Sequence, residues 1–130
     1  MTGEDSVTLP NDLLAPARAR AWITAHAGAI DDVVLDDALL VASELVTNAV
    51  RHGLPDVVLT LRRSRDVLRI EVEDAGGRMP AAADTVPGSD RASGRGLVIV
   101  AATARGWGVA ANRHGPGKTV WAELAIAPGG

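Results

Sequence analysis

A helix predicted over residues 31–52 constrains the chain most, because it sets a carboxylate and a carboxamide four residues apart within an apolar helical pattern. Glu44 and Asn48 therefore share one helical face. We expect this pair to point away from the apolar stripe, on the side of Asp37 and Arg51. The stripe itself comprises Leu35, Leu39, Ala42, Val46 and Ala49. One face of the helix should pack against a core, and the other is free for chemistry.

The pair formed by Glu44 and Asn48 has two interpretations. A hard oxygen ligand beside a potential general base is what a magnesium-dependent phosphoryl-transfer site needs. Glu and Asn at this spacing also occur on ordinary solvated helix faces, where they have no chemical role. Taken alone, the pair favours the solvated face, so the rest of the chain must decide.

Glycine turns follow at three later places. A strand predicted over residues 67–73 runs into Asp74 and the turn around Gly76, which places this carboxylate at a strand end. Further on, glycines stand before an apolar helical run over residues 95–104, where backbone N–H groups and the helix dipole can face an anion. A last turn at Gly117 opens a terminal strand. Each turn alone is also compatible with an ordinary hairpin or helix start.

The order of these segments is more specific than any one of them. Glu-x-x-x-Asn, Asp-x-Gly, Gly-x-Gly-Leu and Gly-x-Thr in sequence resemble the GHKL superfamily of ATP-binding domains. Within this superfamily the chain more closely resembles the bacterial anti-sigma-factor serine kinases, whose helix reads Ser-Glu-Leu-Val-Thr-Asn-Ala-Val much as residues 43–50 do. The resemblance covers nearly the whole chain, and it implies ATP and Mg²⁺ as cofactors.

The resemblance also implies roles for the matching residues. Glu44 corresponds to the general base toward a serine of a partner protein, and Asn48 to the magnesium ligand. Asp74 corresponds to the acceptor of a hydrogen bond from the adenine amino group. Gly76 lets the backbone approach the base closely, and Thr119 lies near the adenine.

Phosphate binding is implied for the second glycine turn. Its residues are Gly94, Gly96 and Leu97. Serine-kinase relatives carry a basic residue near this turn that reaches the terminal phosphate, and the candidates here are Arg91 and Arg95. The preceding segment, residues 78–93, corresponds to the ATP lid and is expected to order around bound phosphates. An ordinary surface loop is the alternative.

Three functions are compatible with the resemblance. The first is an anti-sigma-factor serine kinase, which binds a sigma factor and phosphorylates an anti-sigma antagonist protein with Mg-ATP. The second is a non-catalytic, nucleotide-gated protein-binding module. It is favoured by Arg78, because the related motif often reads Asp-x-Gly-x-Gly and Arg78 stands at its last position. The third is an accessory histidine-kinase-like ATPase domain, although no phosphoacceptor helix is expected before residue 10.

Related anti-sigma kinases form dimers, so the resemblance also implies a possible homodimer. The first predicted helix carries two large apolar residues, Trp22 and Ile23. These residues either serve such an interface or pack in the core, and core packing is the more common role.

Composition restricts the remaining possibilities. With 130 residues, 47% of them hydrophobic, the chain is expected to form a single globular domain over residues 1–130. The absence of cysteine excludes disulfides and thiolate metal sites and fits a cytoplasmic location. No apolar run approaches the roughly 20 residues of a membrane span, and no secretory leader is expected.

Direct nucleic-acid binding is not expected, because the formal net charge is −3. Four arginines nevertheless straddle a predicted hairpin turn, where alternation places some of them on an exposed strand face. They are Arg62, Arg63, Arg65 and Arg69. A basic surface for docking a protein is the alternative role of this group.

The remaining pattern predicts the fold class. A short strand is expected near residues 7–9 and a helix over 11–27, with Asn11 and Asp31 as candidate caps of the two helix starts. Strands over 57–63 and 67–73 are joined by a three-residue hairpin loop, and strands near 107–112 and 119–126 complete the chain. These elements predict an α/β (α+β) two-layer sandwich, with a mixed, mostly antiparallel sheet covered on one face by about three helices. The resemblance implies that this sandwich is of the GHKL ATPase/kinase type.

Overall fold

Eight helices and strands build the fold in the computed structural model, which describes residues 3–76, 92–112 and 115–126, and of residues 92–97 the backbone only. In chain order they are β1 (Gly3–Leu9), α1 (Ala15–His26), α2 (Asp32–His52), β2 (Val57–Arg63), β3 (Val67–Asp74), α3 (Ala92–Thr103), β4 (Gly106–Ala111) and β5 (Lys118–Ala125).

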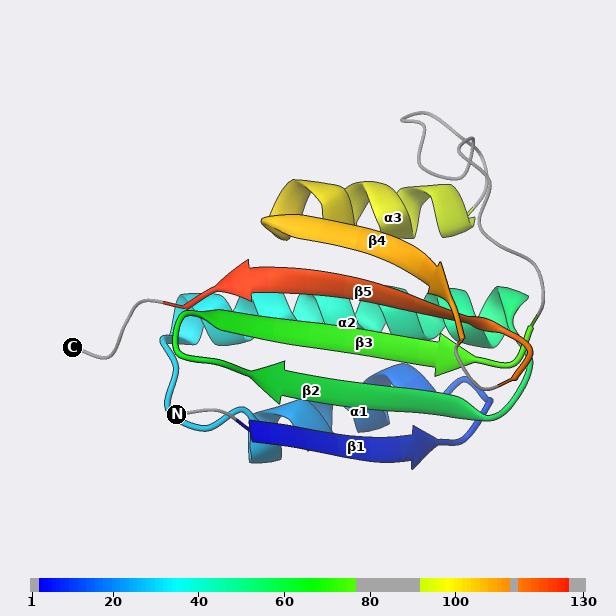
Figure 1. Cartoon of the computed structure of the whole chain (residues 1–130), viewed down its shortest axis with the longest axis horizontal. Coiled ribbons are helices and arrows are strands. Elements are labelled where there is room, and N and C mark those ends of the chain that lie inside the picture. Colours follow the sequence, from blue (N-terminus) through cyan, green and yellow to red (C-terminus); the bar gives the residue numbers. More distant parts are fainter. Residues whose placement is uncertain (1–2, 77–91, 113–114, 127–130) are drawn as a thin grey trace.

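The strands form one sheet in the order β1-β2-β3-β5-β4, and each neighbouring pair is antiparallel. The strands β2 and β3 form the predicted hairpin, closed by a hydrogen bond of 2.9 Å from the Ser64 amide to the Val67 carbonyl. The three helices of the described chain lie on one side of the sheet, and no described helix or strand covers the other side, which we call the open face (Figure 1). The predicted two-layer sandwich is therefore confirmed.

The core lies between the sheet and the helices, and strand alternation determines which side chains enter it. Every second residue of the three central strands is buried beneath the helices. These residues are Val57, Leu59, Leu61, Leu68, Ile70, Val72, Val120, Ala122 and Leu124. The same alternation turns Asp74 and Lys118 toward the helix side, and this parity positions the site described below.

The first helix begins later than predicted. It starts at Ala15, and Asn11 does not cap it. Instead, the Asp12 carboxylate accepts a hydrogen bond of 2.8 Å from the Leu14 amide, and Pro16 stands in the first helical turn, where a missing N–H costs nothing. Asp31 does occupy the N-cap position of α2, but its side chain makes no capping hydrogen bond.

The first strand is longer than predicted, because it pairs with β2 from Gly3 to Leu9. Most of its side chains are exposed, so the sequence there lacks the apolar alternation that marks a half-buried strand. In α1, Ile23 is fully buried in the core, while Trp22 is half-buried and stacks on His26. None of the helices in the described part of the chain is long and apolar enough to cross a membrane.

We predict that Leu45→Ala lowers the free energy of unfolding by about 2–5 kcal/mol, because Leu45 is 1% exposed in α2 and its truncation leaves a cavity. Leu40→Ala is the matched control, since Leu40 lies on the same helix and is 42% exposed. Urea denaturation of the two variants measures the difference. Equal losses of stability would contradict the assignment of the packing face of α2.

Candidate functional site

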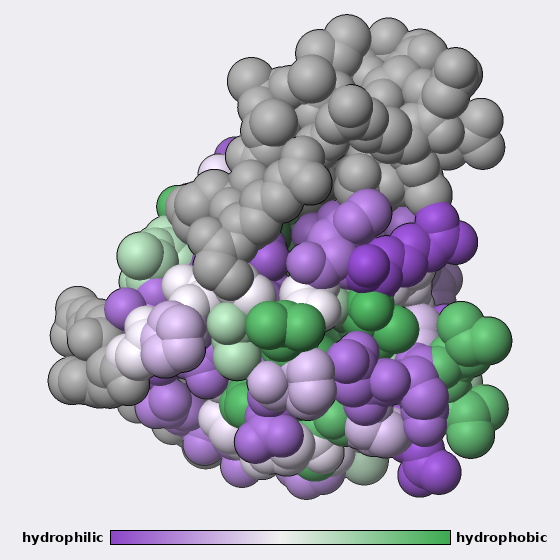
Figure 2. Space-filling view, turned by 90° about the vertical axis from the view of Figure 1, so that its right-hand side faces the viewer, coloured by the Kyte–Doolittle hydropathy of each residue, from purple (hydrophilic) through white to green (hydrophobic). Residues whose placement is uncertain are grey.

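The predicted site residues gather at one end of the molecule. The carboxyl end of α2, the end of β3 and the starts of α3 and β5 all lie there (Figure 1). The helix α2 contacts β3, β5 and α3, so this arrangement is held by direct packing. Figure 2 looks onto this end and shows hydrophilic and hydrophobic residues interspersed over the described surface.

The α2 pair differs from the sequence prediction in one respect. Glu44 is half-buried, but Asn48 is only 5% exposed and does not point away from the packed side of the helix. The reason is that α2 packs against α1 and α3 as well as against the sheet, which widens its buried sector. Ala38, Val41 and Leu45 belong to this sector in addition to the predicted stripe. The site therefore contains a buried carboxamide one helical turn from an accessible carboxylate.

Asp74 ends β3 and is 1% exposed. Its Oδ1 accepts a hydrogen bond of 2.7 Å from the Gly76 amide, which fixes the turn predicted at this strand end. Its Oδ2 lies 3.0 Å from the Lys118 Nζ, and the same ammonium donates to Oδ1 at 3.2 Å. The two residues face each other because Asp74 and Lys118 are register partners of β3 and β5.

Two glycines let the helix end and the strand end meet. A Cβ atom added to Gly76 would lie 3.1 Å from the Gly53 Cα and 3.0 Å from the Asp74 Oδ1. A Cβ atom on Gly53 would collide with the Asp74 carboxylate. The Ala75 amide donates a hydrogen bond of 2.9 Å to the Leu54 carbonyl, which joins the end of β3 to the segment after α2. Sequence reasoning missed Gly53, because a contact between segments about 20 residues apart leaves no local pattern.

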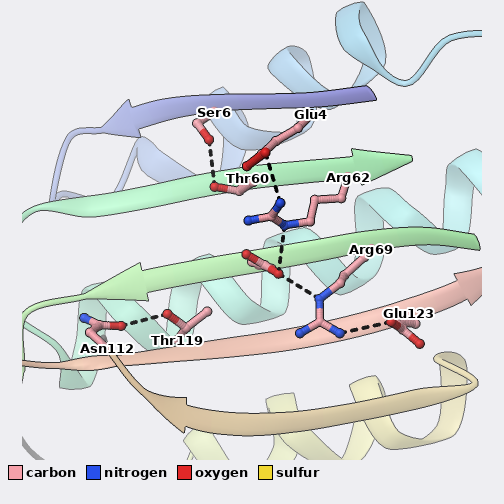
Figure 3. Close-up of polar contacts among 9 residues, drawn as sticks. Glu4, Ser6, Thr60, Arg62, Arg69, Asn112, Thr119 and Glu123 are labelled. Atoms are coloured by element: carbon pink, nitrogen blue, oxygen red, sulfur yellow. Dashed lines mark hydrogen bonds and ion pairs between the residues drawn. The ribbon is translucent and has the colours of Figure 1, made fainter. Parts of the chain in front are cut away.

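Thr119, which the sequence predicts to lie near the adenine, and Lys118 point to opposite faces of the terminal strand. Thr119 lies on the open face of the sheet, where its Oγ1 donates a hydrogen bond of 2.7 Å to the Asn112 Oδ1 (Figure 3). The structure does not bring this side chain together with the Asp74 carboxylate. Lys118, one residue earlier, takes the inward position. Lys118 lies two and four residues before the apolar Val120 and Ala122, so strand alternation puts all three on the same face. This pattern in the sequence could have identified Lys118.

The phosphate turn also differs from the prediction. The helix α3 begins at Ala92, so Gly94, Gly96 and Leu97 lie within its first turns and not in a loop before them. The first backbone N–H groups of a helix still lack intrahelical partners, so the anion-binding potential of this helix start is retained. Arg95 shares this segment, of which the structure describes the backbone. Arg78, Arg91 and residues 78–91 of the predicted lid lie outside the described residues.

The arginines of the hairpin are largely occupied by partners. Arg62 pairs with Glu4 and Glu71 on the open face, and Arg69 bridges Glu71 and Glu123 (Figure 3). Partial burial lowers the pKa of the Arg69 guanidinium, but its bonds to the two glutamates outweigh this effect and raise the pKa above its usual value. The predicted strand face is therefore present, and its arginines are paired with glutamates, which the sequence analysis did not predict.

Arg63 has a different role, because it donates hydrogen bonds of 2.7 Å to the carbonyls of Ala27 and Ala29 just after α1. A depression of about 1010 Å³ crosses the open face, and its lining residues include Arg62, Thr119 and Asp74, although the alternation of β3 turns the Asp74 side chain toward the helices. We do not assign the nucleotide to it, since Glu44 and Asn48 do not line it. The glycine-lined end beside α2 remains the candidate site.

The family model for the histidine kinase-like ATPase domain matches residues 9–124 of this chain. The chain belongs to this family. The match spans every described residue of the site, from α2 to the start of β5. The predicted resemblance to GHKL ATP-binding domains is thereby confirmed, while no curated protein matches the chain.

Solved structures share the fold of this histidine kinase-like ATPase domain. The crystal structure of the RsbU and RsbW domains of Rv1364c from Mycobacterium tuberculosis is 21% identical, with a TM-score of 0.69 over 97% of this chain and 33% of that one. The histidine kinase domain from the Erythrobacter litoralis EL346 blue-light activated histidine kinase is 23% identical, with a TM-score of 0.54 over 86% of this chain and 59% of that one. The chain thus spans a third and somewhat over half of these two proteins.

We predict that Gly53→Ala destabilises this ATPase domain by about 1–3 kcal/mol, because the new methyl group must displace the buried Asp74 carboxylate or the end of α2. Gly3→Ala is the control, since a Cβ atom there meets nothing within 4 Å. Thermal denaturation of both variants provides the measurement. A Gly53→Ala protein as stable as the wild type would show that the packing between α2 and β3 is looser than described.

Proposed function

We propose that this chain is an ATP-binding regulatory protein that acts as an anti-sigma-factor serine kinase and phosphorylates an anti-sigma antagonist protein. One observation supports this proposal above the others. A half-buried glutamate stands one helical turn from a buried asparagine, at the same end of the fold as a buried aspartate that closes β3. This is the arrangement required to hold a nucleotide and to activate a hydroxyl group beside it.

Asp74 is proposed to select the nucleobase. Its Oδ2 lies 3.0 Å from the Lys118 ammonium, whose hydrogen bond goes to Oδ1, so among the described residues the carboxylate keeps acceptor capacity for the adenine amino group. Gly53 and Gly76 contribute no side chains, so the base can approach the backbone at this position. The first turn of α3 would receive the phosphates through its free N–H groups.

Asn48 and Glu44 are proposed to serve the transfer step. The Asn48 carboxamide oxygen is a hard ligand for Mg²⁺, which takes its other ligands from phosphates and water. The described residues contain no group of three or more His, Asp or Glu side chains that could form a metal cage, and an ATP-bound magnesium ion does not require one. Glu44 would take the proton of the partner's serine as its oxygen attacks the γ-phosphorus, and ADP would leave with the β–γ bridging oxygen.

A protein supplies the proposed serine, so the surface near the site must admit one. Glu44 is accessible enough for this role, since it is only half-buried. The fold neighbour that contains an RsbW domain supports an anti-sigma context, as does the helix motif of residues 43–50. Binding of a sigma factor and assembly into a homodimer belong to the same proposal. Direct nucleic-acid binding does not, because acidic partners occupy Arg62 and Arg69.

A non-catalytic, nucleotide-gated binding module is the second candidate. The Gly77-Arg78 sequence after the Asp74 turn favours it, because it departs from the glycine pattern of the related kinases. This candidate shares nucleotide binding with the first and lacks the transfer step. An experiment on Glu44 therefore separates the two.

We predict that Asp74→Asn weakens Mg-ATP binding by about 10- to 100-fold, since a hydrogen bond to a charged group contributes roughly 1.5–3 kcal/mol. Isothermal titration calorimetry measures the affinity, after thermal denaturation has shown that the variant is folded. Glu73→Gln is the matched control, because it makes the same change from carboxylate to amide one residue away on the opposite, exposed face of β3. Wild-type affinity in Asp74→Asn would place the adenine elsewhere.

We predict that Glu44→Ala retains Mg-ATP affinity but lowers phosphorylation of the antagonist protein by about 100-fold or more, because the general base is lost. Transfer of labelled γ-phosphate to candidate antagonists measures this rate. Asp37→Ala is the control, since Asp37 lies two turns earlier on the same side of α2. Unchanged transfer in Glu44→Ala would remove this residue as the base. Absence of transfer in the wild type would favour the binding module, and an acid-labile product would favour histidine as the acceptor.

A further inference from the structure

Lys118 is the only lysine of the chain, and it is 1% exposed. Its buried neighbour of opposite charge is Asp74, and these two residues together with Asn48 are the buried polar residues of the described chain. An ammonium group is rarely buried unless it is paired, because removing it from water is costly. A lysine at this position therefore requires an explanation beyond packing.

The contacts of the pair leave hydrogen-bonding capacity on both partners. Asp74 Oδ1 accepts hydrogen bonds from the Gly76 amide and from Lys118, whereas Oδ2 is in ion-pair contact with Lys118 and accepts no hydrogen bond from another described residue. A carboxylate oxygen can accept two hydrogen bonds, and an ammonium group can donate three. Among the described residues, one acceptor position on Asp74 and at least one N–H of Lys118 therefore have no hydrogen-bond partner and can serve a ligand.

We propose that Lys118 is a second base-reading residue, which donates a hydrogen bond to N1 of adenine while Asp74 accepts one from the adjacent amino group. This inference rests on the proposed ATP-binding function of the site. The 3.0 Å between Nζ and Oδ2 sets a donor directly beside an acceptor. The edge of adenine offers the complementary order, an amino donor beside the N1 acceptor, so both hydrogen bonds form without breaking the ion pair.

The ion pair also determines which bases are rejected. Guanine carries a carbonyl oxygen in place of the amino group and an N–H in place of the bare N1. In the same orientation it would set an acceptor against the Asp74 carboxylate and a donor against the Lys118 ammonium. Such a mismatch leaves buried polar groups unpaired, which is the most effective way for a site to exclude a ligand. Lys118 thus adds a second contact that distinguishes adenine from guanine, beside the contact that Asp74 makes.

The test uses an ATP analogue that lacks only the proposed acceptor. Calorimetric titration compares ATP with 1-deaza-ATP, in which a C–H replaces N1, and with 7-deaza-ATP as the control. We expect the wild-type protein to bind 1-deaza-ATP roughly 10- to 100-fold more weakly than ATP, as expected for loss of a charge-assisted hydrogen bond. The affinity for 7-deaza-ATP should equal that for ATP.

The variant Lys118→Met keeps most of the side-chain length and removes the donor. We expect it to bind ATP and 1-deaza-ATP with equal affinity, close to that of the wild type for 1-deaza-ATP. Equal binding of both nucleotides by the wild type would overturn the inference while leaving the ATP site intact, and so would tighter ATP binding by Lys118→Met, since the ammonium would then be an obstacle. If the variant does not fold, the wild-type comparison decides, and a wild type that binds no ATP overturns the proposed function together with this inference.

Discussion

The antiparallel pairing of β3 with β5 is the constraint on which the site depends. It sets Asp74 opposite Lys118 and turns both toward the helices, in line with the apolar residues that fill the core. Since side chains alternate with a period of two, a register slip of one residue would turn one of the pair out to the open face. The large apolar area buried along both strands opposes such a slip. The hydrophobic core thereby determines where the charged groups of the site can lie.

The pairing of β3 with β5 also explains where polar residues enter the apolar core. Asn48, Asp74 and Lys118 are the residues that break the apolar pattern of the described core, and all three lie at the end of the molecule where α2 and β3 finish and β5 begins. Buried polar groups lower the stability of a core unless they are fully bonded. Natural sequences retain such exceptions mainly at functional sites. The position of these residues thus supports a binding site independently of any motif.

The sequence predicted regular elements well where burial imposes a period. The α2 helix and the β2–β3 hairpin combine a clear apolar period with polar ends, and their observed bounds lie within one residue of those predicted. The long β1 strand and the late start of α1 were missed, because backbone pairing and the Asp12 turn leave no apolar period. At the site, the motif pointed to Thr119, which lies on the open face of the sheet, whereas strand alternation turns Lys118 toward the helices. Motif spacing identifies a segment, whereas alternation identifies the side chain that faces inward.

Charge pairs on the two faces of the sheet have different consequences, although their chemistry is similar. Arg62 and Glu4 are 47% and 51% exposed, and such pairs contribute about 0–1 kcal/mol because water and salt screen them. The side chains of Lys118 and Asp74 are 2% and 1% exposed, so water cannot replace either partner. Loss of one partner there leaves an uncompensated charge. Charges on the open face can therefore change with little effect on the fold. At the site, any ligand must instead form its hydrogen bonds with Asp74 and Lys118, which are already paired with each other.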